Sequence, residues 1–350
     1  MLQIRHEMPP QFLTLSASEL HKHFQGPTVI HLPGKRVPPV FISIMLHGNE
    51  GVGLEAIQVA LAEYAHQALP RELILFIGNT EAAQQGQRKL PHQLDFNRVW
   101  PGTDLPPSPI SECMRSVVDY VKNIGAFVSL DLHNNTGANP HYSCINRVDA
   151  RTLHLALLFA RTIVYFQRPL GVQSAAMTEL CPSITCECGK VGDAGGVERA
   201  ARLIEACLQM LELPKHYPQA SDYHLLRTVA TIKVNPCASF GFSGSSTTAD
   251  LILPENLARL NFRPLSHGTV LGKQRPGRDF ALTIFSEVDE DVTDDFLAVI
   301  NDEIVLCRAA IPSMFTTDAQ VIRDDCLGYF MEEFSREEHE LGSFTSTDFC

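Results

Sequence analysis

The sequence lacks a long hydrophobic run and an excess of basic residues. No stretch of about 18 apolar residues occurs, so we expect no membrane-spanning helix in these 350 residues. The first residues, MLQIRHEMPPQF, have no apolar core followed by a small-residue cleavage site, so no secretory signal is predicted. Lys and Arg number 28 against 40 Asp and Glu, a net charge of -12, which argues against a nucleic-acid-binding protein.

Several chemistry-bearing motifs are also absent. The ten cysteines form no C-x-x-C pair, so the usual cysteine-based zinc motifs are excluded. Without an export signal, we expect these cysteines to be reduced thiols in a cytoplasm. Neither G-x-G-x-x-G nor Gly-Lys-Ser/Thr occurs, which argues against a phosphate-binding loop. The segment GFSGSS places glycines near serine but is not the G-x-S-x-G turn of serine hydrolases.

Apolar segments alternate with segments of helical periodicity through the first 212 residues. This alternation predicts an α/β fold, with a mostly parallel or mixed sheet flanked by helices. We predict strands at 39–46, 73–77, 126–132 and 183–189, and helices at 53–69, 108–125, 150–164 and 194–212.

The pattern changes after residue 212. Residues 213–222 contain two prolines and several polar residues, and we interpret them as a linker. Short β-like runs separated by Gly, Pro and Asp then predict a smaller β-rich domain over 223–340. Residues 341–350 are predicted to be a polar tail.

Polar side chains follow the predicted strands of the α/β domain. His47 and Glu50 lie in the glycine-rich segment HGNEGVG after the first strand, and His133 follows the third in DLHNNTG. Glu187 lies in the fourth, SITCECG. Because ligands bind beyond the carboxyl ends of strands in open α/β sheets, we expect these side chains to meet at one edge.

Two imidazoles and one carboxylate are a recurrent ligand set for catalytic zinc, with bonds of about 2.0–2.2 Å. His47, Glu50 and His133 are the predicted ligands, although other divalent metals bind the same groups. Zinc lowers the pKa of its bound water to about 7, and this water would attack an acyl carbonyl. Glu187 would take the proton and return it to the leaving amine. Asp131, on the same strand face as His133, would hold the His133 ring.

Taken singly, each of these residues also fits an ordinary structural role. His47 and Glu50 could form a polar turn, and His133 could be a hydrogen-bonded strand-end histidine. Glu187 could pair with Lys190, because a buried carboxylate without a partner is costly. The shared position at strand ends favours the metal site over these separate explanations.

Cys186 and Cys188 flank Glu187 and raise the possibility of a thiol nucleophile. Side chains alternate between the two faces of a strand, so both cysteines would point away from Glu187. We therefore predict that they pack in the core.

Four motifs, HGNEGVG, DFNRVWPG, DLHNNTG and ITCECG, occur in this order between residues 45 and 189. The set resembles the succinylglutamate desuccinylase/aspartoacylase family, within the wider zinc carboxypeptidase group, and the β-rich segment resembles that family's C-terminal domain. The resemblance implies zinc bound by His47, Glu50 and His133, with Glu187 as general base and acid. It also implies that Asn97 and Arg98 bind the substrate carboxylate, a task that suits the planar guanidinium.

The sequence departs from the family pattern at two places. DFNR replaces the commoner DLNR, and Thr80 and Glu81 occupy the neighbourhood in which aspartoacylase-like members carry a substrate-binding arginine. The nearest cation that could substitute is Arg88, and Arg147 is a second basic candidate.

These observations together predict a cytoplasmic hydrolase with one zinc ion per chain. It would cleave the amide bond of an N-acyl amino acid, a small anionic substrate, with no nucleic-acid or membrane partner. The alternatives are a carboxypeptidase-like enzyme acting on small peptides and a non-catalytic relative that binds zinc or a small ligand. A homo-oligomer is possible, and the sequence does not decide it.

Overall fold

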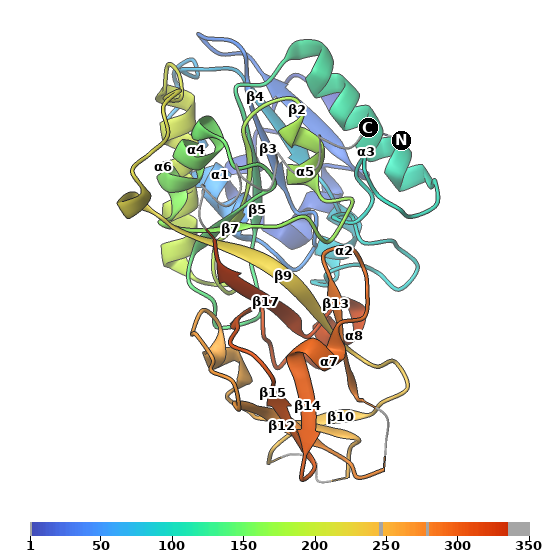
Figure 1. The fold of residues 1–350 in the computed structure, drawn as a ribbon. Coiled ribbons are helices and arrows are strands. Elements are labelled where there is room, and N and C mark those ends of the chain that lie inside the picture. Colours follow the sequence, from blue (N-terminus) through green and yellow to red (C-terminus); the bar gives the residue numbers. More distant parts are fainter. Residues whose placement is uncertain (1, 245–247, 278–279, 335–350) are drawn as a thin grey trace. The chain divides into compact units, whose positions relative to one another are not determined.

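The computed structural model describes residues 2–244, 248–277 and 280–334 (Figure 1). The chain divides into two compact units. The first contains the residues up to 134 together with 141–165 and 169–224. The second contains 135–140, 166–168 and the described residues from 225 onward. In this division the predicted linker 213–222 belongs to the first unit, and the predicted tail 341–350 lies outside the described residues.

A mixed β-sheet forms the centre of the first unit, with the strand order β1-β2-β4-β3-β5-β8-β6-β7. Its strands are β1 (Gln3–Arg5), β2 (Thr28–Leu32), β3 (Val40–Ile44), β4 (Leu73–Ile77), β5 (Val128–His133), β6 (Tyr142–Ile145), β7 (Thr162–Tyr165) and β8 (Ser183–Glu187). The pairs β2–β4 and β6–β8 are antiparallel, whereas β4, β3, β5 and β8 run parallel to one another. The prediction of a mostly parallel or mixed sheet is confirmed.

The four central parallel strands explain why their sequences are continuous apolar runs. Every residue of β3, β4, β5 and β8 is buried, because helices cover both faces of the sheet. Neighbouring strands end at matching positions: Ile44 pairs with Ile77, and His133 pairs with Glu187. Residues that follow these strands are therefore delivered to one edge of the sheet.

The helices of the first unit are α1 (Val52–Ala62), α2 (Thr80–Gln84), α3 (Pro109–Ile124), α4 (Ala150–Phe159), α5 (Gln173–Thr178) and α6 (Ala194–Gln209), with 3-10 turns η1 (Phe12–Thr14), η2 (Ala17–Lys22) and η3 (Ala220–Asp222). Figure 1 shows α1, α4 and α6 on one side of the sheet and α3 and α5 on the other. On the α3 side, Met114 and Val117 pack with Phe41 and Phe76 around Trp100 in one apolar cluster.

Helix α3 follows its sequence signals closely. Ser108 caps the first turn by accepting a hydrogen bond from the Ser111 N–H, and Pro109 occupies the first helical position. The helix ends at Gly125, whose φ of 86° lies in the left-handed region that favours glycine. The predicted helix at 108–125 is thus confirmed.

Three predicted helices are shorter than their patterns indicated, and the one predicted at 194–212 ends at Gln209. The helix predicted at 53–69 ends at Ala62, because no residue between Leu61 and Leu69 is buried and nothing holds further turns against the sheet. The helix predicted at 150–164 ends at Phe159, and residues 162–165 form strand β7 parallel to β6. The segment TIVY is rich in β-branched and aromatic residues, which favours a buried strand there.

The second unit is rich in β-structure. One of its sheets pairs β9 (His224–Val234) with β13 (Leu282–Ser286) and β17 (Gly328–Glu333), and β17 also pairs with β16 (Ile311–Ser313). The other has the strand order β10-β11-β12-β15-β14, with β10 (Phe240–Phe242), β11 (Leu251–Leu253), β12 (Val270–Gln274), β15 (Glu303–Leu306) and β14 (Leu297–Ile300). Short helical elements are η4 (Leu257–Leu260), α7 (Thr293–Phe296) and α8 (Ala319–Asp324). The prediction of a β-rich C-terminal part is confirmed.

Across the described ranges, no helix has the length and apolar character needed to cross a membrane.

Candidate metal and active site

Residues 45–51 form the turn between β3 and α1, and the last two residues of the HGNEGVG segment, Val52 and Gly53, begin α1. The turn begins at Met45, a buried residue whose φ is 57°. A Cβ on Gly48 would lie 2.2 Å from the backbone nitrogen of Ala83, and a Cβ on Gly53 would lie 2.7 Å from Cγ2 of Ile44. Glycine at these two positions therefore allows the turn and α1 to approach their neighbours closely, which fixes the turn against β3.

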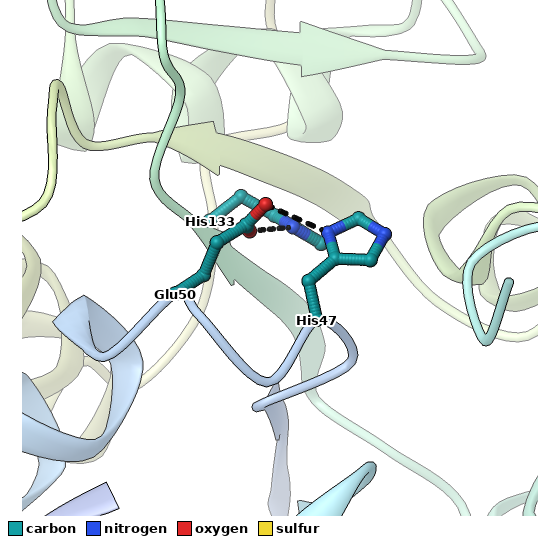
Figure 2. A group of neighbouring side chains, drawn as sticks. All are labelled: His47, Glu50 and His133. Atoms are coloured by element: carbon teal, nitrogen blue, oxygen red, sulfur yellow. Dashed lines mark hydrogen bonds and ion pairs between the residues drawn. The ribbon is translucent and has the colours of Figure 1, made fainter. Parts of the chain in front are cut away.

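His47, Glu50 and His133 converge at the edge of the sheet. Figure 2 shows the Glu50 carboxylate between the two imidazoles. Its Oε1 lies 2.8 Å from Nδ1 of His47, and its Oε2 lies 2.7 Å from Nδ1 of His133. The potential ligand atoms of the three residues all lie within 4.8 Å of one another. His47, Glu50 and His133 are only 3%, 7% and 4% exposed, respectively, so the group is shielded from solvent.

The other ring nitrogen of each histidine faces an aspartate. Nε2 of His133 lies 2.8 Å from Oδ2 of Asp131, whose Oδ1 accepts a 2.5 Å hydrogen bond from Ser43. Nε2 of His47 lies 3.1 Å from Oδ1 of Asp95. A carboxylate that accepts from one ring nitrogen orients the other nitrogen toward a metal. Two imidazoles, each paired with an aspartate, and one carboxylate fit a zinc ion.

Asp95 is a site residue that the sequence reasoning missed. It is the first residue of the DFNR motif, two positions before Asn97, and that position was a usable signal. Its role is visible only in the folded structure, in which the long loop that carries Asp95 lies near the end of β3 and Asp95 contacts His47.

Charge coupling favours the ionised forms within this cluster. Burial by itself raises the pKa of Glu50, but the neighbouring His47 and His133 outweigh it and hold this pKa well below its ordinary value. Burial lowers the pKa of His133, yet Asp131 and Glu50 raise it well above its usual range. Glu50 is thus a carboxylate, the form that binds a cation, whereas a metal must compete with a proton for His133.

Glu187 ends β8 directly beside His133. The two residues are register partners on adjacent parallel strands, so their side chains project to the same face of the sheet. Glu187 is buried, whereas Lys190, its partner in the alternative interpretation, is exposed.

The cysteines that flank Glu187 are completely buried. Burial raises the pKa of both the Cys186 and the Cys188 thiol well above the ordinary value. The prediction that these cysteines pack in the core is confirmed by their burial, and the raised pKa disfavours the thiolate.

Asn97 lies next to His133, and Arg98 contacts the backbone of Asn97. Nδ2 of Asn97 lies 3.3 Å from Nε2 of His133, and its Oδ1 accepts a 2.9 Å hydrogen bond from the backbone N–H of Gln173. Arg98 donates to the carbonyl oxygen of Asn97 at 2.8 Å. Asn97 is therefore anchored on both sides of its amide.

Arg88 also reaches this edge. Its guanidinium donates to Oδ2 of Asp95 at 2.9 and 3.1 Å and lies 3.7 Å from Oε1 of Glu50. Arg147 instead pairs with Glu179, and its side chain is 46% exposed. Of the two alternative cations, the structure brings Arg88 into contact with the candidate ligand set.

Thr80 and Glu81, which occupy the neighbourhood in which the resemblance implies an arginine, both contact other residues. The Thr80 hydroxyl donates to the carbonyl of Phe24, and Glu81 accepts a hydrogen bond from Gln93.

Residues 36–212, half of the chain, match the family model described as "Succinylglutamate desuccinylase/Aspartoacylase catalytic domain". No curated protein sequence matches the chain significantly.

Solved structures with the same fold include a succinylglutamate desuccinylase from Chromobacterium violaceum, with 18% identity and a TM-score of 0.53, covering 81% of this chain and 89% of that one. A succinylglutamate desuccinylase/aspartoacylase from Rhodobacter sphaeroides has 16% identity and a TM-score of 0.55, covering 87% and 89%. Murine aminoacylase 3 has 16% identity and a TM-score of 0.53, covering 86% and 97%. At these identities the similarity establishes a shared fold.

Proposed function

The chain belongs to the succinylglutamate desuccinylase/aspartoacylase family, and from this premise we propose that it is a zinc-dependent hydrolase that cleaves the amide bond of an N-acyl amino acid. The solved relatives that are named desuccinylases and an aminoacylase support this substrate class.

The observation that carries the proposal is the buried group of His47, Glu50 and His133 with Glu187 beside it in register. Two imidazoles and a carboxylate leave one position of a tetrahedral zinc site open, which distinguishes a catalytic site from a closed structural one. A carboxylate next to that open position supplies the base that a purely structural site does not need.

The three ligand residues would hold zinc, which when bound supplies a Lewis acid that lowers the pKa of water and polarises a carbonyl oxygen. Glu187 would accept the proton of the attacking water and donate it to the nitrogen of the leaving amino acid. Asp131 and Asp95 would keep each imidazole oriented through its outer nitrogen.

Arginines beside the ligand set favour an anionic substrate. Arg88 and Arg98 both act on Asp95: burial raises the pKa of this carboxyl, but Arg88, His47 and then Arg98 hold it well below its ordinary value. The charge of Arg88 is shared between Asp95 and Glu50, so we propose that Arg98 receives the substrate carboxylate, which arginine binds with two parallel hydrogen bonds. Asn97 would complete this contact, as the family pattern implies.

The test begins with the metal content of the purified protein, measured by elemental analysis. The zinc-loaded protein is then assayed with N-succinylglutamate, N-acetylaspartate, neutral N-acetyl amino acids and short peptides. We expect about one zinc per chain and hydrolysis of an acidic N-acyl amino acid. Glu187→Gln should retain zinc and lower kcat about 10²–10⁴-fold, the usual contribution of a general base.

Glu179→Gln is the matched control, because it makes the same change in the same unit at an exposed residue paired with Arg147. It should leave kcat unchanged. Zinc binding without hydrolysis of any substrate would indicate a non-catalytic relative, and a preference for peptides would indicate a carboxypeptidase-like enzyme. Absence of zinc binding would refute the proposal.

A further inference from the structure

The side-chain amide of Asn134 lies between the two loops that carry the candidate catalytic groups. Asn134 follows His133 at the end of β5 and is 5% exposed. Its Oδ1 accepts a hydrogen bond from the backbone N–H of Val52, two residues after Glu50. Its Nδ2 donates to the carbonyl oxygen of Gly189, two residues after Glu187. Both contacts are 3.1 Å, so one buried amide joins the ligand turn to the loop that follows the candidate base.

The Gly189 loop is also held from its other side. Gly189 has a φ of 79°, and a Cβ there would lie 2.5 Å from Oδ2 of Asp193 and 2.9 Å from Nε2 of His141. These two side chains are paired, with Nε2 of His141 lying 3.0 Å from Oδ2 of Asp193. The other oxygen of Asp193 accepts the N–H of Gly195 at the start of α6. The loop is therefore enclosed between Asn134 and the His141–Asp193 pair.

We propose that Asn134 is a positioning residue that sets the place of Glu187 relative to His47, Glu50 and His133. The proposal rests on the function proposed above for this site. Asn134 touches neither the substrate nor the reacting atoms in this role and acts only through the backbones of Val52 and Gly189. Because proton transfer requires hydrogen-bond reach, a small displacement of Glu187 lowers the rate of the chemical step more than it weakens substrate binding.

The substitution Asn134→Asp removes one of the two hydrogen bonds and keeps the other. Aspartate keeps an oxygen for the Val52 N–H but places a second oxygen against the Gly189 carbonyl, where no hydrogen bond can form. We expect the variant to retain about one zinc per chain and a nearly unchanged KM, while kcat falls by up to about 10²-fold, the cost of a displacement of about 1 Å. His141→Gln, which disturbs the same loop from the opposite side, should give the same pattern and serves if Asn134→Asp fails to fold.

The matched control is Asn146→Asp. Oδ1 of Asn146 accepts a hydrogen bond from the Ser174 hydroxyl, which an aspartate can still receive. This control should leave zinc content, kcat and KM unchanged.

A readout without turnover distinguishes failure of this proposal from failure of the proposed function. In the zinc-loaded protein, backbone amides of residues 188–192 should exchange hydrogen about tenfold faster in Asn134→Asp than in the wild type, whereas those of β5 should not change. Unchanged exchange at 188–192, or loss of zinc together with activity, would overturn the proposal. If the wild type binds zinc but hydrolyses nothing, the proposed function fails, and the exchange measurement still decides whether Asn134 holds the loop.

Discussion

Replacing Asp95 with asparagine tests whether the carboxylate behind His47 supports the metal site. The carboxylate receives four contacts from three residues: Nε2 of His47 at 3.1 Å, Nη2 and Nε of Arg88 at 2.9 and 3.1 Å, and the backbone N–H of Asn97 at 2.7 Å. Asparagine has nearly the same size but has one acceptor oxygen instead of two, and no charge. At least one of these donors therefore loses its acceptor, and Arg88 loses its closest counter-charge.

The expected magnitude follows from the two losses. Removal of an outer partner of a metal-binding histidine lowers metal affinity about 10–100-fold, which corresponds to about 1.4–2.7 kcal/mol. A donor left without its partner in this part-buried site would lower the free energy of unfolding by a further amount of about 1–3 kcal/mol. The variant should thus bind zinc more weakly and unfold at lower denaturant concentration, with its fold intact.

Zinc affinity is measured by competition with a chromophoric chelator at fixed pH, and stability by urea unfolding of the metal-free protein. Glu72→Gln is the matched control, because Glu72 also faces a histidine, with Oε2 lying 3.4 Å from Nε2 of His31, but neither residue belongs to the ligand set. Equal zinc affinity of Asp95→Asn and the wild type would refute the reasoning. An equal loss in Glu72→Gln would show that the effect is not specific to the ligand set.

Three further predictions concern the metal and the fold. Zinc affinity should rise with pH by about tenfold per unit, because zinc must displace a proton from His133. Burial lowers the pKa of His133, but Asp131 and Glu50 outweigh this effect and raise it. Calorimetric titrations that show no pH dependence of zinc affinity would contradict the prediction. Gly53→Ala should lower stability by about 1–3 kcal/mol through overpacking against Ile44. Gly51→Ala, whose nearest contact is Glu55 at 3.4 Å, should cost much less in the same thermal unfolding assay. Ser108→Ala should remove the cap of α3 and lower the free energy of unfolding by about 1 kcal/mol, measured by urea unfolding. An equal loss of stability in Ser116→Ala, an exposed mid-helix position, would argue against a capping effect.

Much of the first unit was predictable because its strands are buried on both faces. A strand covered on both sides must be apolar throughout, so 39–46, 73–77, 126–132 and 183–189 stood out as continuous runs. Helix ends were predictable where local caps set them, as in α3. They were not predictable where a lack of tertiary contact ended the helix, as at Ala62, or where residues 162–165 pair with a neighbouring strand.

The sequence by itself determined which candidate ligands and which candidate base meet at the edge of the sheet. His47 and Glu50 follow one buried strand, His133 ends a second and Glu187 a third, and parallel strands must bring their carboxyl ends to one edge. Tertiary structure alone decided the partners of these residues. Asp95 and Arg88 lie in an irregular loop, and the side-chain amide of Asn134 joins backbones that are distant in sequence. Such contacts leave no periodic pattern in the sequence. They depend on the path of each loop in space, which only the folded molecule determines.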